Sequence, residues 1–129
     1  MQFQPSTALR WAVVLVASGV AAACARSPDP VSFAADVKPL LDTHCAACHL
    51  PGQPGYEASG LGLDSYEALM KGTRYGPVVL PGDALSSVLT MLIEGRADQS
   101  INMPHGVAAL PDGAKQTIRA WVEQGAKNN

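Results

Sequence analysis

Two cysteines and a histidine stand close together in the run Cys45-Ala46-Ala47-Cys48-His49. This spacing is the attachment signature of c-type haem. Two thiols separated by two residues can form thioethers with the vinyl groups on one side of a porphyrin. The histidine that follows then lies under the ring, where its imidazole can bind iron. The run therefore predicts one covalent haem c, held by Cys45 and Cys48 and ligated by His49.

Other uses of this cysteine pair have less support. A structural zinc site needs four ligands, usually from two Cys or His pairs, and the sequence holds no second pair. A thiol redox motif is typical of a strand-helix-strand unit, which no segment predicts. A plain disulfide between the two cysteines would leave the adjacent histidine unexplained. The one other cysteine, Cys24, stands apart from the pair.

The segment before Cys24 has the features of a targeting sequence. Residues 11–23 are almost continuously apolar and follow one positive charge, Arg10. Because small alanines end the run, residues 1–24 are predicted to be an export signal. Cys24 favours the lipoprotein type, in which that cysteine is lipidated. Cleavage after Ala25 and an uncleaved membrane anchor are the alternatives.

The next residues, 25–31, are polar and contain two prolines, which predicts a short tether. We expect the folded domain to span residues 32–129 and to be exported, either periplasmic or held at a membrane by a lipid anchor. The formal net charge is -2 and the sequence has no basic run. This distribution argues against nucleic acid as a partner.

Hydrophobic periodicity predicts an all-α domain of about four helices. Their expected ranges are 32–44, 65–71, 83–94 and 112–125. The expected N-caps are Ser32, Asp64 and Asp83, and Pro39 should kink the first helix or set a new first turn. The third helix should bury Leu85, Val88, Leu89, Leu92 and Ile93, and the fourth Ile118, Trp121 and Val122. Three loops are predicted between the helices, at 51–63, 73–81 and 97–111. Loops of this length in a small domain are often ordered by a bound group.

The second axial ligand is predicted to be Met103, in the third loop. Pro104 follows it and favours extended backbone, which leaves the thioether free to reach iron. Histidine paired with methionine is the axial arrangement of cytochromes c. His105 is the alternative ligand, whereas Met70 and Met91 lie on expected helices, where packing is their ordinary role.

With these motifs in place, the chain resembles the class I cytochrome c superfamily, and more narrowly the planctomycete type of cytochrome c domain. The ordered pieces that carry the resemblance span residues 32–127: 36–41, the cysteine motif, Gly-Leu-Gly-Leu-Asp at 60–64, 79–83, Met103-Pro104, 118–122 and Gly125-Ala126. The resemblance implies an all-α fold whose first and last helices cross near the haem. It also implies His49 and Met103 as axial ligands. One departure is His105, which stands where the family usually has a second proline.

The function expected from these residues is one-electron transfer to redox partner proteins, without enzymatic activity of its own. Both axial positions are filled in this reading, and no acid–base pair or nucleophile constellation is recognisable in the sequence. A peroxidase-like haem enzyme with an open distal site is one alternative. A sensor or structural haem domain is the other. Arg74 and Tyr75, in the Gly-rich loop, are either haem propionate partners or ordinary surface residues.

Overall fold

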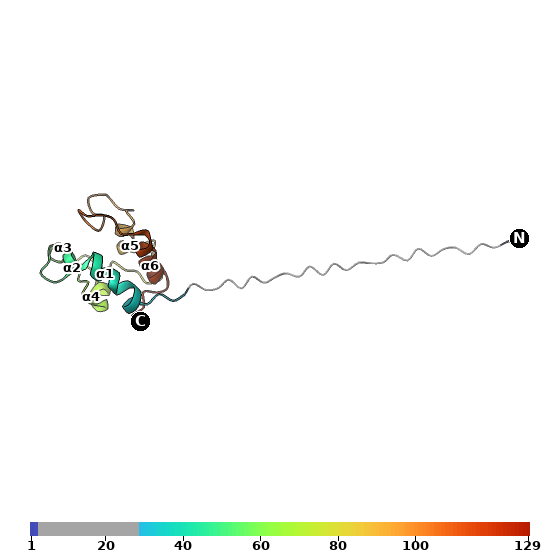
Figure 1. Ribbon diagram of the computed structural model, residues 1–129, viewed down its shortest axis with the longest axis horizontal. Helices are drawn as coiled ribbons and strands as arrows, with labels where there is room; N and C mark the ends of the chain where they lie inside the picture. The colour runs from blue at the N-terminus through green and yellow to red at the C-terminus, as the bar shows by residue number, and fades with distance from the viewer. Residues whose placement is uncertain (3–28) are drawn as a thin grey trace.

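The structure is a computed structural model that describes residues 1–2 and 29–129. Nearly all of the expected export signal, including Cys24, and residues 25–28 of the expected tether lie outside the described residues. Residues 29–129 form six short α-helices and one π-helical turn, and they contain no β-strand beyond one isolated bridge between Thr73 and Gly76 (Figure 1). This confirms the all-α prediction. Among the described residues, no helix is long and apolar enough to cross a membrane.

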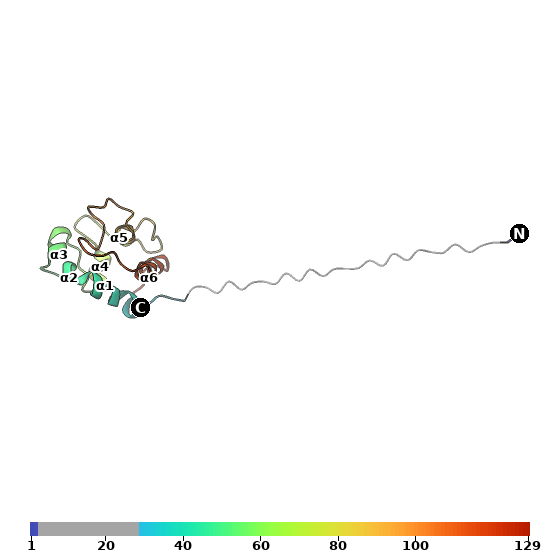
Figure 2. The same ribbon diagram turned by 45° about the horizontal axis from the view of Figure 1, so that its top comes forward.

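The helices, in chain order, are η1 (Phe33–Val37, a π-helical turn), α1 (Lys38–His44), α2 (Ala46–His49), α3 (Pro54–Ser59), α4 (Tyr66–Lys71), α5 (Val88–Ile93) and α6 (Asp112–Glu123). Short connections join the helices from η1 to α4, whereas long loops precede α5 and α6. In both views of the ribbon, α1 lies between the pair α2 and α3 on one side and α6 on the other (Figures 1 and 2).

The first expected helix is present but divided. Ser32 is its N-cap, as predicted, and its hydroxyl accepts a hydrogen bond from the Ala35 amide at 3.1 Å. Pro39 lies in the first turn of α1, where its missing N–H costs no helical hydrogen bond. It therefore sets a new first turn after η1. Cys45 ends α1 and precedes α2, so the chain stays helical into the cysteine motif.

The third expected helix is shorter than predicted. Asp83 caps a turn, because its carboxylate accepts from the Ser86 amide at 2.9 Å, and the N-cap of α5 is Ser87. The Ser87 hydroxyl accepts from the Leu80 amide at 2.8 Å, and its backbone is extended, which interrupts the helix. Leu85 and Val88, expected in the core, are consequently 68% and 40% exposed.

Three aromatic side chains join the first and last helices. The Phe33 ring centroid lies 5.5 Å from that of Trp121 and 5.2 Å from that of Tyr66. Trp121 is 1% exposed, and its indole N–H donates to the Lys127 carbonyl at 2.9 Å. These contacts confirm that η1 packs on α6. The core around them is mostly aliphatic, which fits an aromatic content of only 5%.

The two ends of the domain are fastened to each other. The Ser32 hydroxyl donates to the Asn129 carbonyl at 2.7 Å, and the Phe33 amide donates to the Asn129 side chain at 2.9 Å. The Val31 amide donates to the Gln124 side chain at 2.7 Å. The first and last described residues of the domain therefore meet beside α6.

Candidate functional site

The cysteine motif is held by backbone hydrogen bonds on both sides. The Cys45 amide donates to the Leu41 carbonyl at 2.9 Å, which continues α1, and the His49 amide donates to the Cys45 carbonyl at 3.1 Å. The His49 carbonyl accepts from the Leu63 amide at 3.0 Å. The motif is thus tied to the helix before it and to the Gly-Leu-Gly-Leu segment after it.

Both cysteines of the motif carry free thiols, Cys45 half-buried and Cys48 exposed. Burial, with a smaller effect of the neighbouring Cys48, raises the pKa of Cys45 to about 11. Thiol redox enzymes work with cysteines whose pKa is lowered, so that the thiolate is present. The Cys45 environment therefore does not fit a thiol–disulfide catalyst. No three His, Cys, Asp or Glu side chains gather as metal ligands in residues 29–129, which also disfavours a zinc site.

The His49 ring is partly enclosed. Its Nδ1 atom is buried and has no hydrogen-bond partner among the described residues. Burial lowers the pKa of His49, and the Leu61 backbone acts in the opposite direction. A neutral imidazole is the form that binds iron. Burial of the ring therefore favours the form that ligation requires.

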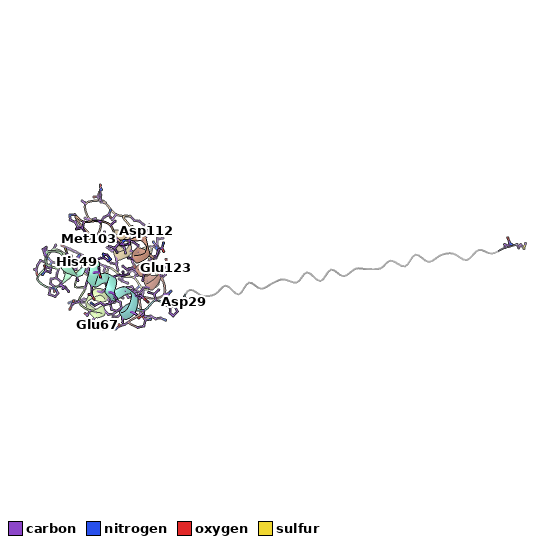
Figure 3. The ribbon with its side chains drawn as sticks, viewed as in Figure 1. Asp29, His49, Glu67, Met103, Asp112 and Glu123 are labelled. Carbon is purple, nitrogen blue, oxygen red and sulfur yellow. The ribbon has the colours of Figure 1, made fainter. Side chains whose placement is uncertain are left out.

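Met103 lies in the loop between α5 and α6. It is partly buried and packs against the hydrophobic core, as Cys45 also does. Its amide donates to the Leu92 carbonyl at 3.1 Å, which ties the loop to the end of α5. Met103 and His49 lie on the same side of the domain in Figure 3, opposite Glu67. The two predicted ligands come from distant parts of the chain, α2 and the loop before α6, and lie on this side of the domain in that view.

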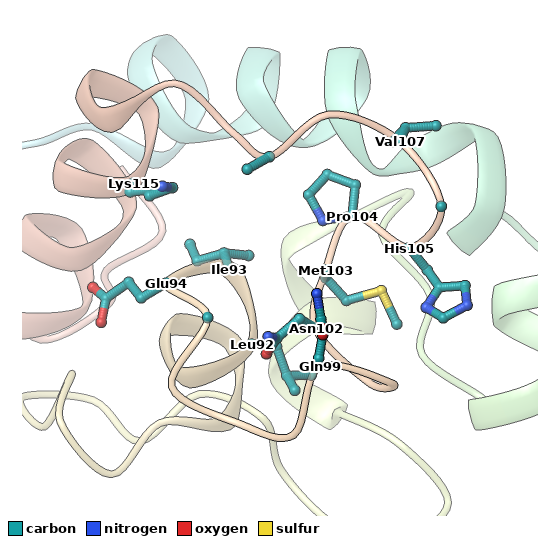
Figure 4. Close-up of a pocket in the computed structure, with 13 residues that line it drawn as sticks. Leu92, Ile93, Glu94, Gln99, Asn102, Met103, Pro104, His105, Val107 and Lys115 are labelled. Atoms are coloured by element: carbon teal, nitrogen blue, oxygen red, sulfur yellow. The ribbon is translucent and has the colours of Figure 1, made fainter.

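A pocket of about 450 Å³ adjoins Met103. Its lining comes from the end of α5, the following loop and Lys115 of α6 (Figure 4). In this view the thioether of Met103 and the imidazole of His105 point to the same side, away from Lys115. His105 itself is exposed. Of the other methionines considered as ligands, Met70 lies on α4 and packs against the core, and Met91 lies on α5.

The loop that carries Met103 begins beside an ion-pair network. Arg119 of α6 donates to both carboxylate oxygens of Glu94, from Nε at 2.7 Å and from Nη2 at 2.6 Å. Arg96 donates to the same carboxylate at 2.7 Å and to the Leu85 carbonyl at 2.9 Å. Glu94 is 15% exposed. It therefore connects α6, the end of α5 and the start of the loop.

Replacing Glu94 with glutamine should lower the free energy of unfolding by about 1–3 kcal/mol at neutral pH, because a charged partner of two arginines is lost. The Arg119 hydrogen bond, helped by Arg96, lowers the pKa of Glu94 below its usual 4.5. A lowered folded pKa means that the contribution is complete above about pH 4.5 and is lost as pH falls through the folded value. Urea unfolding of both proteins from pH 7 to pH 3 measures this difference.

Glu123→Gln is the matched control, because Glu123 pairs with the same Arg119 at 3.1 Å but is 53% exposed. That exposed pair should contribute less than about 0.5 kcal/mol. Equal losses in the two variants, or a Glu94→Gln loss that does not shrink in acid, would contradict the role given to Glu94.

The hydrogen bonds that Arg74 and Tyr75 form in the structure do not involve His49 or Met103. The Arg74 guanidinium donates to the Glu57 carbonyl at 2.7 Å, and the Arg74 amide donates to the Ser59 carbonyl at 3.0 Å. Tyr75 is 83% exposed. In this structure Arg74 therefore holds α3 in place.

The short helix α3 was not predicted from the sequence, nor was the position of Gly55 beside His49. The run Pro51-Gly52-Gln53-Pro54-Gly55 was expected to be loop, because proline and glycine dominate it. Pro54 instead occupies the first helical position of α3, where proline is favoured, and Gly55 follows it against His49. The pairing of a proline with a helix start was the available signal.

The donor set fits a covalently attached haem. His49 offers an imidazole whose buried Nδ1 has no hydrogen-bond partner among the described residues. Met103 offers a half-buried thioether, and the thiols of Cys45 and Cys48 are free for attachment. Nitrogen and sulfur are the axial donors of cytochromes c. The buried residues Leu61 and Leu63, beside His49 in the fold, supply apolar surroundings.

Comparisons with known proteins identify a family for the segment that contains the cysteine motif. The family described as Planctomycete cytochrome C matches residues 45–105. A search of curated proteins found no match. Among solved structures, Kuenenia stuttgartiensis Hydrazine Synthase is similar with a TM-score of 0.53 and 22% sequence identity. The alignment covers 74% of this chain and 16% of that chain, so the likeness concerns the fold alone.

The matched family segment begins at Cys45 and ends at His105, so it includes both cysteines of the motif, His49 and Met103. The helical architecture around that segment is consistent with the cytochrome c fold. The chain therefore contains a planctomycete cytochrome c domain, which implies covalently bound haem c.

Proposed function

We propose that this chain is a single-haem electron carrier. One Cys-x-x-Cys-His run occurs in the sequence, which supports one haem per chain. Cys45 and Cys48 would form the thioethers, and His49 and Met103 would bind the iron. When bound, haem supplies a one-electron couple between ferric and ferrous iron. The observation that carries the proposal is the Cys-x-x-Cys-His run with its partly enclosed imidazole, inside a segment, residues 45–105, that matches a cytochrome c family.

The chain's own residues have two tasks in this function. His49 and Met103 would both bind the iron, which would leave no coordination place for a substrate. The buried side chains of Leu61 and Leu63, near His49, would keep water from the site. Neutral surroundings and a thioether ligand both favour the reduced state, since they stabilise the form with less charge. The proposal includes export of the domain, to the periplasm or to a membrane surface through Cys24, and protein redox partners.

Replacing Met103 with alanine should remove the sulfur–iron charge-transfer band of the oxidised protein while leaving the covalent haem in place. It should also lower the reduction potential, because the thioether ligand is lost, and should allow carbon monoxide to bind to the reduced protein. The measurements are the absorption spectrum, a redox titration and the carbon monoxide difference spectrum.

Met70→Ala is the matched control for this experiment, because Met70 is also half-buried against the core but lies on α4. It should keep the band. A band that persists in Met103→Ala and disappears in Met70→Ala or Met91→Ala would assign the ligand to that methionine. A low-spin spectrum without the band in the unaltered protein would point to His105.

The main alternative is a haem enzyme with an open distal site. The similar solved structure is named as an enzyme, Hydrazine Synthase, and that name describes that protein. Carbon monoxide binding and peroxide turnover by the unaltered protein would favour an enzyme. Failure to bind carbon monoxide, together with rapid electron exchange with a redox partner, would favour the electron carrier.

A further inference from the structure

The first turn of α3 lies directly against His49. A Cβ atom built at Gly55 would be 2.7 Å from the Cys48 carbonyl oxygen. It would also be 3.0 Å from Cε1 and 3.1 Å from Nε2 of the His49 ring. Real Cβ atoms essentially never approach another heavy atom to 2.7 Å, and here that atom belongs to the backbone. A side chain at position 55 would therefore force α2, α3 or the ring to move.

Backbone conformation does not explain this glycine. Gly55 is not among the residues with positive φ, and it lies inside a helix, where alanine is favoured over glycine by about 1 kcal/mol. By contrast, Gly113 in α6 has no heavy atom within 4 Å of its built Cβ. The contact with Cys48 and His49 is thus what keeps position 55 without a side chain.

Hydrogen bonds hold α3 in this position. The Ser59 hydroxyl donates to the Gly55 carbonyl at 2.7 Å and accepts from the Leu61 amide at 3.1 Å. Arg74 anchors the C-terminal half of the helix through the Glu57 carbonyl at 2.7 Å and the Ser59 carbonyl at 3.0 Å. The Ser59–Gly55 bond joins this anchored half to the first turn, so the first turn beside the ring should follow the position of the C-terminal half.

We propose that Gly55 is a positioning residue for the proximal histidine, and that α3 is the wall that sets the rotation of the His49 ring. This inference rests on the proposed role of His49 as an iron ligand. The absence of a side chain at position 55 leaves free the space beside Cε1 and Nε2 that a Cβ atom would fill, while Nδ1 is buried. The rotation of the imidazole then follows the position of α3, and Arg74 fixes that position.

The test compares Gly55→Ala with Gly113→Ala in the full chain carrying covalent haem. The readouts are the hyperfine-shifted resonances of the His49 ring protons in the oxidised protein and the reduction potential. Gly55→Ala should shift both, because the added methyl group moves the ring. Gly113→Ala should shift neither, since its methyl group enters open space. A folded Gly55→Ala protein with unchanged resonances and potential would overturn the inference.

Arg74→Ala provides a second test that adds no atom to the site and serves where Gly55→Ala fails to assemble. Loss of the Glu57 bond should let α3 shift and change the His49 resonances, and unchanged resonances would contradict the wall role of α3. If the unaltered protein shows no hyperfine-shifted His49 resonances at all, the proposed function fails instead. The two failures are therefore distinguishable.

Discussion

Replacing both Cys45 and Cys48 with alanine should abolish covalent haem attachment. No other pair of thiols in the chain has the spacing that the vinyl groups require, because Cys24 is the one cysteine left. The described domain should also unfold at a lower temperature, since a large apolar group would add to the core of a small domain that is poor in aromatic side chains. Haem staining after a denaturing gel measures the attachment, and thermal unfolding measures the stability.

Ala47→Ser is the control for this experiment, because Ala47 lies between the two cysteines and is exposed. It should keep the haem stain of the unaltered protein. Stain retained by the double cysteine variant in a host with the attachment machinery would contradict covalent attachment at this motif. Stain lost in Ala47→Ser as well would show that the test reports on the whole segment and not on the thiols.

Replacing Trp121 with alanine should lower the free energy of unfolding by about 3–5 kcal/mol. The side chain is 1% exposed, contacts the ring of Phe33 and donates a hydrogen bond to the Lys127 carbonyl. Its removal leaves a cavity between η1 and α6 and an unpaired carbonyl. A small domain has about 5–15 kcal/mol in total, so the variant should be largely unfolded at mild urea concentrations. Urea titration followed by circular dichroism measures the change.

Tyr75→Ala supplies the comparison, since Tyr75 is an aromatic residue that is 83% exposed. Its loss should change the free energy of unfolding by less than about 0.5 kcal/mol. A Trp121→Ala loss as small as that of Tyr75→Ala would mean that the contact between the first and last helices contributes little to the fold.

The parts of the fold that were predictable from sequence are those set by local chemistry. The Ser32 cap, the new turn at Pro39, the end of α4 at Gly72 and the buried stripe of α6 all follow from neighbouring residues, and the structure confirms them. Local rules decide these features because a cap or a stripe is formed within one or two turns of helix. One local prediction was wrong: the N-cap of α4 is Ser65 and not Asp64, because the Ser65 hydroxyl accepts from the Ala68 amide at 3.1 Å.

The other features that were missed depend on partners beyond one turn of helix. Asp83 has the chemistry of a helix cap, but the Ser87 hydroxyl bonds the Leu80 amide and moves the start of α5 to Val88. The packing of Gly55 on His49 depends on how Arg74 holds α3, which no local pattern reveals. The haem attachment motif could be recognised from its residue types. The position of α3 beside the His49 ring could be seen only in the three-dimensional structure.

The two ends of the domain lie together, and their position decides which side of the domain would face away from anything attached to them. Asp29 and the C-terminus lie on one side of the domain, whereas His49 lies at the opposite side, with α2 and α3 (Figures 1 and 3). Any segment joined at either end would therefore leave the domain on the side opposite His49. A lipid or a neighbouring domain fastened there would leave the ligand side facing outward, free to meet a partner.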